Sequence, residues 1–537
     1  MATVGDAKNN NRHPLCHAPL VIRGIASYLN DTDLIAFSQT CRMVHFHTST
    51  PFWHTLEIHS KAYMQSLLDI LDRSRQCPGC FDHRQYISSV QTSTSRMSQV
   101  TLEQWLQFCT LAPSIAHLSL HRFFSEECGY TVGTLCGNKI RHLLLEDIFG
   151  TVSSRTLERF TALRSFTYTH TYSGVMSDDA VQVLVENNHC TLITLELRCE
   201  RLSDLSIKYI CRLFAPRPIL NNTFTSTTLR HLTLDITPQM SPNIVRQLAQ
   251  QAHSLQTLTL RMRSSNPFSP SAMDLAIADL VNSNASTLNS LALSRFPLLD
   301  STLQALKAVD NFDPFPMKAP SFITSQLPPT PPYSPDTLSL RSGYFSDAPR
   351  LIFPHLSQLS LCYMNDLRPG QLIQLLEILG PQLYRLTLCA LDALVDDHIK
   401  RSLKPCRNLR ELVLEELHQF SGEHGWLADL LKDMSPCHLY IRNCGSKNWR
   451  LSSVVEQLSR YSVGQFRFTG CGCLQCGMTG YPVICTPTKG ITSTRKPINR
   501  SVNIETILQE RGWLPSLVPF DVKWLNKVSR RLEFVGY

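Results

Sequence analysis

The sequence predicts an α/β solenoid, in which a curved parallel sheet carries helices on its outer side and follows a small helical domain. The main observation is a repeated six-residue stretch with large apolar residues at positions one, four and six, such as LYRLTL from Leu383 to Leu388. Most copies begin 23 to 29 residues after the previous copy, and helix-forming patterns lie between them. A period of this length is typical of stacked repeats.

Twelve copies of the stretch follow one another along the chain. They begin at Ile115, Ile140, Leu163, Leu192, Leu229, Leu255, Leu288, Leu356, Leu383, Leu409, Pro436 and Val463. Alternation within each copy predicts a short strand. After Leu234, Ser241 can cap a helix, Pro242 suits its first position, and Ile244 and Val245 begin its apolar face.

This combination of strand, helix and return predicts the longer, helix-bearing leucine-rich repeat. One repeat cannot bury its own leucines, so neighbouring repeats must stack and their strands must form one parallel sheet on the concave side of an arc. A two-layer α/β domain is the alternative, but such a domain does not require a fixed period. We assign the repeats to residues 111–470.

The N-terminal part of the chain differs from the repeats. Residues 1–13 are polar and predict a disordered tail, whereas residues 14–57 predict a helical domain. Apolar residues at helical spacing form two groups separated by Asn30, a good helix-start residue. These groups are Ile22, Ile25, Ala26 and Leu29, followed by Leu34, Phe37, Ser38 and Cys41.

Residues 14–57 resemble an F-box in the order of their motifs. The matching features are Ala18-Pro19, Ile22, Ile25, Tyr28-Leu29, Asp33-Leu34, Cys41-Arg42 and Phe52-Trp53 with Leu56. The chain therefore resembles the F-box and leucine-rich-repeat proteins of the fungal kind. The resemblance implies that the residues of the F-box core and of the adaptor contact are Pro19, Ile22, Ile25, Leu29, Leu34 and Trp53. A helical cap that only covers the open end of the solenoid is the alternative.

Two segments interrupt the repeat pattern. Residues 58–110 predict connecting helices and a loop, with a helix over Tyr63 to Leu71, a loop over Gln91 to Gln99 and a capping box at Thr101. Residues 310–350 hold nine prolines and predict a disordered insertion. Thr330 and Ser334 each precede proline and are candidate phosphorylation sites, with an inert spacer as the alternative; residues 337–340 are a candidate extra strand.

The strand register predicts which side chains line the concave surface. Positions three and five of each copy point away from the leucine core and form two rows, with short hydroxyl side chains in the middle of the arc. Larger and charged residues gather toward the C-terminal end, and Tyr and Arg often anchor interfaces. We therefore predict that the partner-binding residues are Arg385, Glu411, Glu415, Tyr440, Arg442 and Arg467. Solvated strand positions without a partner are the alternative.

Three groups of residues are candidate metal ligands. Cys471, Cys473, Cys476 and Cys485 have a spacing that can wrap one zinc ion. A poorer zinc candidate consists of Cys77, Cys80 and His83, and His117 with His142 forms a pair that lacks a third ligand. Unliganded thiols are the alternative for the cysteine groups. The chain otherwise predicts no cofactor.

The composition narrows the class of protein. The chain has 537 residues, 43% apolar residues, a net charge of +8 and nineteen cysteines. Its apolar runs are too short for a membrane helix and its start lacks a secretory signal, so we expect a protein of a reducing compartment, the cytoplasm or the nucleus. Residues 471–537 form a basic, cysteine-containing cap, whose aromatic residues we expect to cover the last repeat rather than to bind nucleic acid.

No catalytic motif is visible, so we expect a protein that is not an enzyme. The resemblance implies a substrate-recognition adaptor of a Skp-cullin-F-box type ubiquitin ligase. Its F-box would bind a Skp-type adaptor, and its repeats would bind an unknown target protein. A leucine-rich-repeat protein-binding scaffold unrelated to ubiquitin is the main alternative. A GTPase activator is a further alternative, but the acidic tail expected of that type does not follow the repeats.

Overall fold

A computed structural model describes most of the chain up to residue 420 and three strands beyond it. The described residues are 19–26, 28–29, 31–40, 44–45, 47–48, 53–76, 82–92, 100–121, 126–148, 151–170, 175–215, 229–263, 268–297, 299–307, 309–310, 350–351, 353–364, 366–420, 438–442, 444, 465–469 and 483–485. In this part of the chain, no helix is long and apolar enough to cross a membrane.

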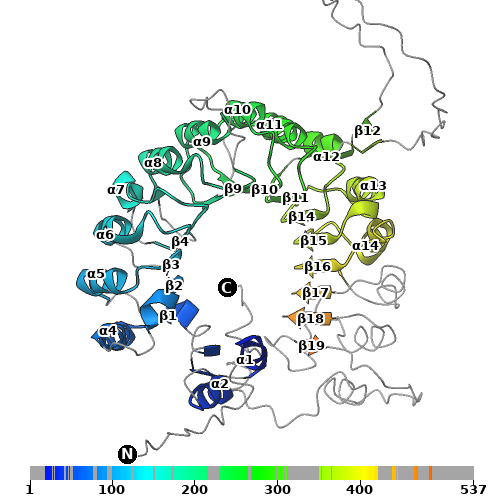
Figure 1. Cartoon of the computed structure of the whole chain (residues 1–537). Helices are drawn as coiled ribbons and strands as arrows, with labels where there is room; N and C mark the ends of the chain where they lie inside the picture. Colours follow the sequence, from blue (N-terminus) through cyan, green and yellow to red (C-terminus); the bar gives the residue numbers. More distant parts are fainter. Residues whose placement is uncertain are drawn as a thin grey trace, which may run out of the picture.

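Most of the described strands form one long curved sheet, as Figure 1 shows. In spatial order they are β1 Thr55–Ile58, β2 Ser89–Thr92, β3 His117–His121, β4 His142–Glu146, β6 Ser165–Thr169, β8 Thr194–Arg198, β9 His231–Ile236, β10 Thr257–Met262, β11 Ser290–Ser294, β14 Gln358–Cys362, β15 Arg385–Cys389, β16 Glu411–Glu415, β17 His438–Arg442, β18 Gln465–Thr469 and β19 Val483–Cys485. All neighbours are parallel except β18 and β19. This arrangement confirms the predicted solenoid.

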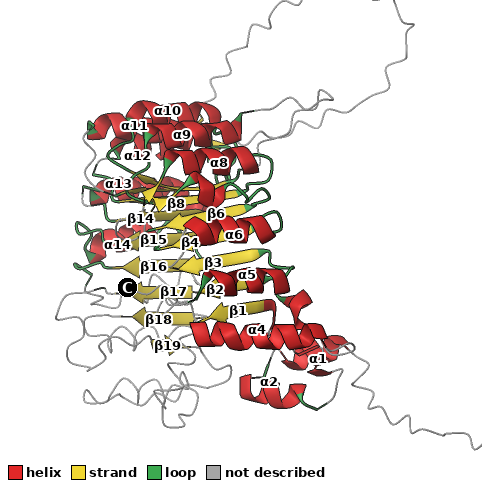
Figure 2. Ribbon diagram, turned by 90° about the vertical axis from the view of Figure 1, so that its left-hand side faces the viewer, coloured by secondary structure: helices red, strands yellow, loops and turns green. Residues whose placement is uncertain are grey.

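Helices cover the outer side of the sheet, while the strands line the inner side of the arc (Figures 1 and 2). The outer helices are α4 Lys61–Gln76, α5 Leu102–Leu111, α6 Glu126–Cys136, α7 Ser154–Leu157, α8 Asp178–Asn188, α9 Asp204–Cys211, α10 Pro242–Gln251, α11 Pro270–Ser283, α12 Asp300–Lys307, α13 Pro369–Leu379 and α14 Asp396–Leu403. Two short helices, α1 Pro19–Ala26 and α2 Asp31–Ser38, precede the first strand. Each repeat therefore supplies one strand to the inside and, in most repeats, one helix to the outside.

The core between the two layers consists of the predicted leucine positions. Buried side chains run without a break in the cluster from Leu56 at one end to Cys444 at the other. In β15, for example, Leu386 and Leu388 are fully buried, whereas Arg385 and Thr387, which alternate with them, lie on the other face of the strand. No described repeat has a separate core, because the buried leucines of one repeat pack against those of the next.

Polar contacts join the starts of successive outer helices. Ser241 caps α10 by accepting a hydrogen bond from the Ile244 amide, and its own hydroxyl donates to Asp204 in the first turn of α9, 2.7 Å away. In the same way, Asp274 of α11 accepts from the amide and hydroxyl of Thr302 in α12. Acidic side chains near helix N-termini complement the helix dipole. These contacts fix each helix against the preceding one.

The sheet begins earlier than the sequence predicted. We assigned residues 58–110 to connecting helices and a loop, but β1 and β2 pair in parallel with each other and β2 pairs with β3. The loop predicted over Gln91 to Gln99 is wrong at its start, because Gln91 and Thr92 belong to β2. The helix over Tyr63 to Leu71 and the capping box at Thr101 are confirmed, as α4 and as the start of α5.

The proline-rich insertion lies outside the described residues apart from its two ends. There, β12 Val309–Asp310 pairs antiparallel with β13 Arg350–Leu351. The two ends of the insertion are thus held together where it leaves and rejoins the repeats. A second small pairing joins β5 Thr151–Val152 to β7 Val175–Met176 in parallel. The candidate strand at residues 337–340 and the two candidate phosphorylation sites are not among the described residues.

Candidate functional site

The helix α1 presents an exposed apolar stripe. Val21 and Ile25 on α1, and Tyr28 in the turn that follows it, recur at helical spacing and are 44%, 38% and 91% exposed. On the opposite side of α1, Ile22 and Ala26 are buried, as is Leu34 of α2. A short helix whose buried face is already satisfied, yet which also exposes large apolar side chains, has a second face available for a partner.

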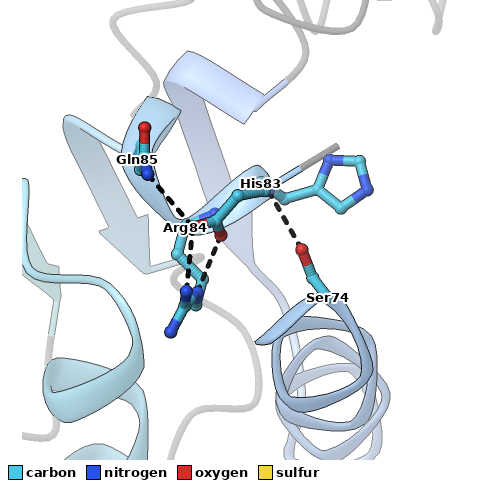
Figure 3. Close-up of polar contacts among 5 residues, drawn as sticks. Ser74, His83, Arg84 and Gln85 are labelled. Atoms are coloured by element: carbon cyan, nitrogen blue, oxygen red, sulfur yellow. Dashed lines mark hydrogen bonds and ion pairs between the residues drawn. The ribbon is translucent and has the colours of Figure 1, made fainter. Parts of the chain in front are cut away.

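Trp53 connects the helical segment to the solenoid. Its ring stacks on the ring of His83, with centroids 4.1 Å apart, and it packs against the core of the repeats. His83 belongs to a short 3₁₀ turn, His83–Tyr86, that precedes β2. Figure 3 shows how this turn is held: the His83 amide donates to the Ser74 hydroxyl, and Arg84 binds the Asp82 carboxylate through two nitrogens at 2.7 and 2.8 Å.

The six predicted adaptor-contact residues therefore divide between two environments. Ile22 and Leu34 are buried in the helical segment and Trp53 is half-buried against the repeats, so these three hold the structure together. Ile25 is exposed and Leu29 is partly exposed. Pro19 begins α1, but its side chain lies outside the description. Val21 and Tyr28 join Ile25 on the exposed stripe, although the motif order alone does not select Val21.

The concave surface has the register that the sequence predicted. From His117 and His142 at one end to Arg385 and Glu411 near the other, the position-three residues of neighbouring strands are direct partners. The position-five residues form the second row, for example Thr259 beside Ala292. The middle of the arc therefore carries short side chains, and charges lie on both sides of it.

Two of the predicted partner-binding residues bind each other. Arg385 and Glu411 form an ion pair at 3.2 Å, with Arg385 46% and Glu411 21% exposed. Glu415 lies on the same face of β16, and Tyr440 is partly exposed on β17. Arg442 ends β17 and Arg467 lies in β18, but the side chains of both are outside the description. Among these residues, part of the charge is thus compensated within the chain.

The predicted metal groups gain no support from the described residues. His117 and His142 are stacked with centroids 4.1 Å apart and planes 3° from parallel, and no group of three potential ligands occurs in the described part of the chain. Burial lowers the pKa of both histidines, and each is also affected by a neighbouring histidine, His54 for His117 and His117 for His142. Cys77, Cys80, Cys471, Cys473 and Cys476 lie outside the described residues, and of Cys485 only the backbone, in β19, is described.

An arginine cluster at the centre of the arc was not predicted. Four arginines gather where β8, β9, β10 and β11 end: Arg198, Arg261, Arg263 and Arg295. The two predicted rows followed positions three and five, and position seven was considered only near the C-terminal end, at Glu415 and Arg442, whereas Arg198 and Arg261 occupy position seven in the middle of the arc. Extending the same register by two residues would have found them, together with Asp235, the direct partner of Arg261.

Three of these arginines have partners within the chain. Arg263 is 12% exposed and binds the fully buried Asp235, 2.7 Å from Nε to Oδ2, and also the carbonyl of His170. Arg198 binds Glu196 at 2.6 Å. Arg295 lies 5.1 Å above the ring of Tyr363, a favourable cation–π position.

Arg261 differs from the other three arginines. Within the described part of the chain, it forms no ion pair and no hydrogen bond through its guanidinium. It lies on the same face of β10 as Thr257 and Thr259, partly exposed to the concave surface. Burial lowers the pKa of Arg261, as do Arg295, Arg263 and Arg198, while Asp235 raises it. Among the described residues, the charge of Arg261 is thus offset only in part, by Asp235, which also binds Arg263.

Comparison with known proteins adds little to these observations. No protein-family model matches the chain, and no curated protein is similar to it in sequence. A chain of the solved Rad7 and Elc1 complex from yeast is similar in structure, with a TM-score of 0.45 and 14% sequence identity over 84% of this chain and 96% of that chain. A likeness of this size says nothing about what the present chain binds.

Proposed function

We propose that the chain is a non-catalytic substrate-recognition adaptor of a Skp-cullin-F-box type ubiquitin ligase. The observation that carries the proposal is the apolar stripe of Val21 and Ile25 on α1 and Tyr28 in the turn after it, which stays exposed while Ile22 and Ala26 of the helix are buried. In this proposal the stripe binds a Skp-type adaptor, and through it a cullin complex. The order of motifs in residues 14–57, which resembles an F-box, supports the same assignment.

The second half of the proposal concerns the concave face. Its strands present two in-register rows of short polar side chains with charges at the centre and near Arg385, a surface suited to an extended segment of another protein. Holding a target protein beside a conjugating enzyme raises the effective concentration of its lysines. The chain itself would supply no chemistry, and the complex would act in the cytoplasm or the nucleus.

Pull-down of a Skp-type adaptor by the full chain tests the first half. We expect the triple variant Val21→Ser, Ile25→Ser, Tyr28→Ser to lose adaptor binding, because each change removes exposed apolar area and leaves the buried side of α1 intact. Leu205→Ser is the matched control, since Leu205 is 43% exposed on α9, far along the arc. Binding that survives the triple variant, or that never occurs, would favour the scaffold unrelated to ubiquitin.

A further inference from the structure

Two cysteines on neighbouring strands of the arc lie side by side as free thiols. Cys362 ends β14 and Cys389 ends β15, and the two are direct register partners in the parallel sheet. Neighbouring strands lie about 4.8 Å apart, and the Cα atoms of disulfide-bonded cysteines are usually about 4.4 to 6.8 Å apart. The two thiols are also hydrogen-bonded to each other, so their side chains point toward one another. A disulfide can therefore close here without moving the backbone.

The two thiols differ in their access to solvent. Cys362 shares the concave face of β14 with Gln358 and Ser360 and is partly exposed. Cys389 is only 3% exposed, and the side chain of Tyr363 is hydrogen-bonded to it. A small reagent from solvent therefore reaches Cys362 first, and Cys389 lies behind it within reach of its sulfur.

The surroundings of Cys362 favour its thiolate form. The hydrogen bond from Cys389 lowers the pKa of Cys362, and the Ser360 hydroxyl, 3.3 Å from the sulfur, acts in the same direction. Burial and the carboxylates of Glu415 and Glu416 oppose this shift. The same hydrogen bond is the main reason why the pKa of Cys389 is raised. Because the thiolate is the nucleophilic form of cysteine, Cys362 is the more reactive member of the pair.

We propose that Cys362 and Cys389 are a modification site at which a hydroperoxide forms a reversible disulfide. In the first step the Cys362 thiolate attacks the O–O bond, becomes a sulfenic acid and releases the other oxygen as hydroxide or alkoxide. In the second step the Cys389 sulfur attacks the sulfenic sulfur, the S–S bond forms, and the hydroxyl leaves with the thiol proton as water. The hydroperoxide gains the two electrons that the thiols lose, and a thiol reductant reverses the reaction.

The bridge would tie two successive repeats together on the concave face. Cys389 closes the strand that begins with Arg385, one of the predicted partner-binding residues. Oxidation would therefore fix this strand covalently to β14. A metal centre at the pair has less support, because no group of three potential ligands occurs in the described part of the chain. The site goes beyond the adaptor role and does not depend on it, because that role was argued from α1.

A second thiol pair provides a matched control. Cys109 of α5 and Cys136 of α6 are also hydrogen-bonded to each other, but they are only 4% and 1% exposed. Cys128, which lies near them, is buried as well. A hydroperoxide should reach these thiols only when the repeats open. Comparing the two pairs within one protein therefore separates the effect of access from that of proximity.

The experiment treats the full-length chain, reduced and then freed of reductant, with hydrogen peroxide. The chain is then denatured in N-ethylmaleimide, which blocks the remaining thiols, and a tryptic digest is analysed without reduction. Trypsin does not cleave before proline, so it places Cys362 in residues 351–385 and Cys389 in residues 386–400, and neither fragment holds another cysteine. We expect this bridged pair of peptides to form about tenfold faster, or more, than a bridge between Cys109 and Cys136. Dithiothreitol should remove it.

Single substitutions assign the two steps. Cys389→Ser leaves the Cys362 sulfenic acid without a second thiol, so dimedone, which reacts with sulfenic acids, should label Cys362 strongly in this variant and weakly in the parent chain. Cys362→Ser should abolish the bridge and leave Cys389 unlabelled. Cys190→Ser is the matched control, because Cys190 is an exposed cysteine that follows α8, and the bridge should form in it at the parent rate. Circular dichroism checks that each variant folds.

Several results would overturn the proposal. One is a sulfenic acid that persists at Cys362 of the parent chain without a bridge to Cys389. Others are a bridge that forms only in denaturant, or one that forms no faster than the bridge between the buried cysteines. A disulfide from Cys362 to any other cysteine in place of Cys389 would also exclude the proposed pair.

Discussion

At the scale of single residues, His83 illustrates how one ring can join two parts of the chain. It stacks on Trp53, and its ring also contacts that of His45 at 6.4 Å. The pKa of His83 is lowered to about 4, mainly by burial and also by His45, while Asp82 opposes the shift. The histidine is therefore neutral in the folded chain at neutral pH, and its protonation favours the unfolded state.

A pH dependence of stability follows from this shift. Because the folded pKa is about 4 and the unfolded value is 6.5, stability is fully present above pH 6.5 and falls as the pH drops toward 4. After allowance for partial solvent exposure, we expect a loss of about 2 kcal/mol from this group. Urea unfolding of the parent chain and of His83→Phe, which keeps the stacking on Trp53, measures the difference across this range. Equal losses in the two proteins would contradict a neutral, buried His83.

The sequence predicts the burial and the role of a residue well where a single local rule determines them. The buried leucines follow from periodicity, and the capping role of Ser241 follows from its place before Pro242. Trp53 and Arg261 were harder to interpret, because their environments depend on contacts between distant segments. Trp53 and His83 lie on either side of α4 in the chain and meet only in the folded structure. Whether Arg261 has an ion-pair partner depends on which arginine Asp235 binds.

At the scale of elements, the outer helices depend on contacts with their neighbours. The hydroxyl of Ser241 both caps α10 and donates to Asp204 in α9. We expect Ser241→Ala to lower the free energy of unfolding by about 1 to 2 kcal/mol, because it removes the cap and leaves Asp204 without that donor. Equilibrium denaturation measures this change. Ser241→Thr keeps the hydroxyl and should cost less than half as much; equal costs would mean that the hydroxyl has no role.

Two of the strands that sequence reasoning missed, β1 and β2, show the limit of predicting elements from the sequence. The TLEI segment of β1 is only four residues long, and the SVQT segment of β2 merges into a polar run. β1 nevertheless carries the apolar pattern of the later copies at Trp53, Leu56 and Ile58, and β2 keeps two of its three positions, Ile87 and Val90, so the pattern begins earlier than the sequence search followed it. Both become strands because the edge of the sheet at β3 offers unpaired backbone groups, which β2 and then β1 satisfy.

At the scale of the whole molecule, the structure is a linear array with one continuous core. Within the described part of the chain, each strand of the sheet pairs only with its immediate neighbours, so the described contacts link the two ends of the arc through the repeats between them. In such an array stability is approximately a sum of repeat and interface terms. A defect in a central repeat therefore uncouples the two halves, whereas the same defect at an edge only frays that edge.

Leu291, fully buried in the middle of β11, tests this picture. Replacement of a buried leucine by alanine typically costs about 2 to 5 kcal/mol through lost contacts and the remaining cavity. We expect Leu291→Ala to split the denaturant transition into two steps, because the repeats before and after β11 then unfold separately. Hydrogen exchange should show the loss of protection spreading outward from β10, β11 and β14. Leu275→Ala, at a position on α11 that is 47% exposed, is the control and should retain the parent profile. A single, uniformly shifted transition for Leu291→Ala would instead mean that the array unfolds as one cooperative unit despite its linear contacts.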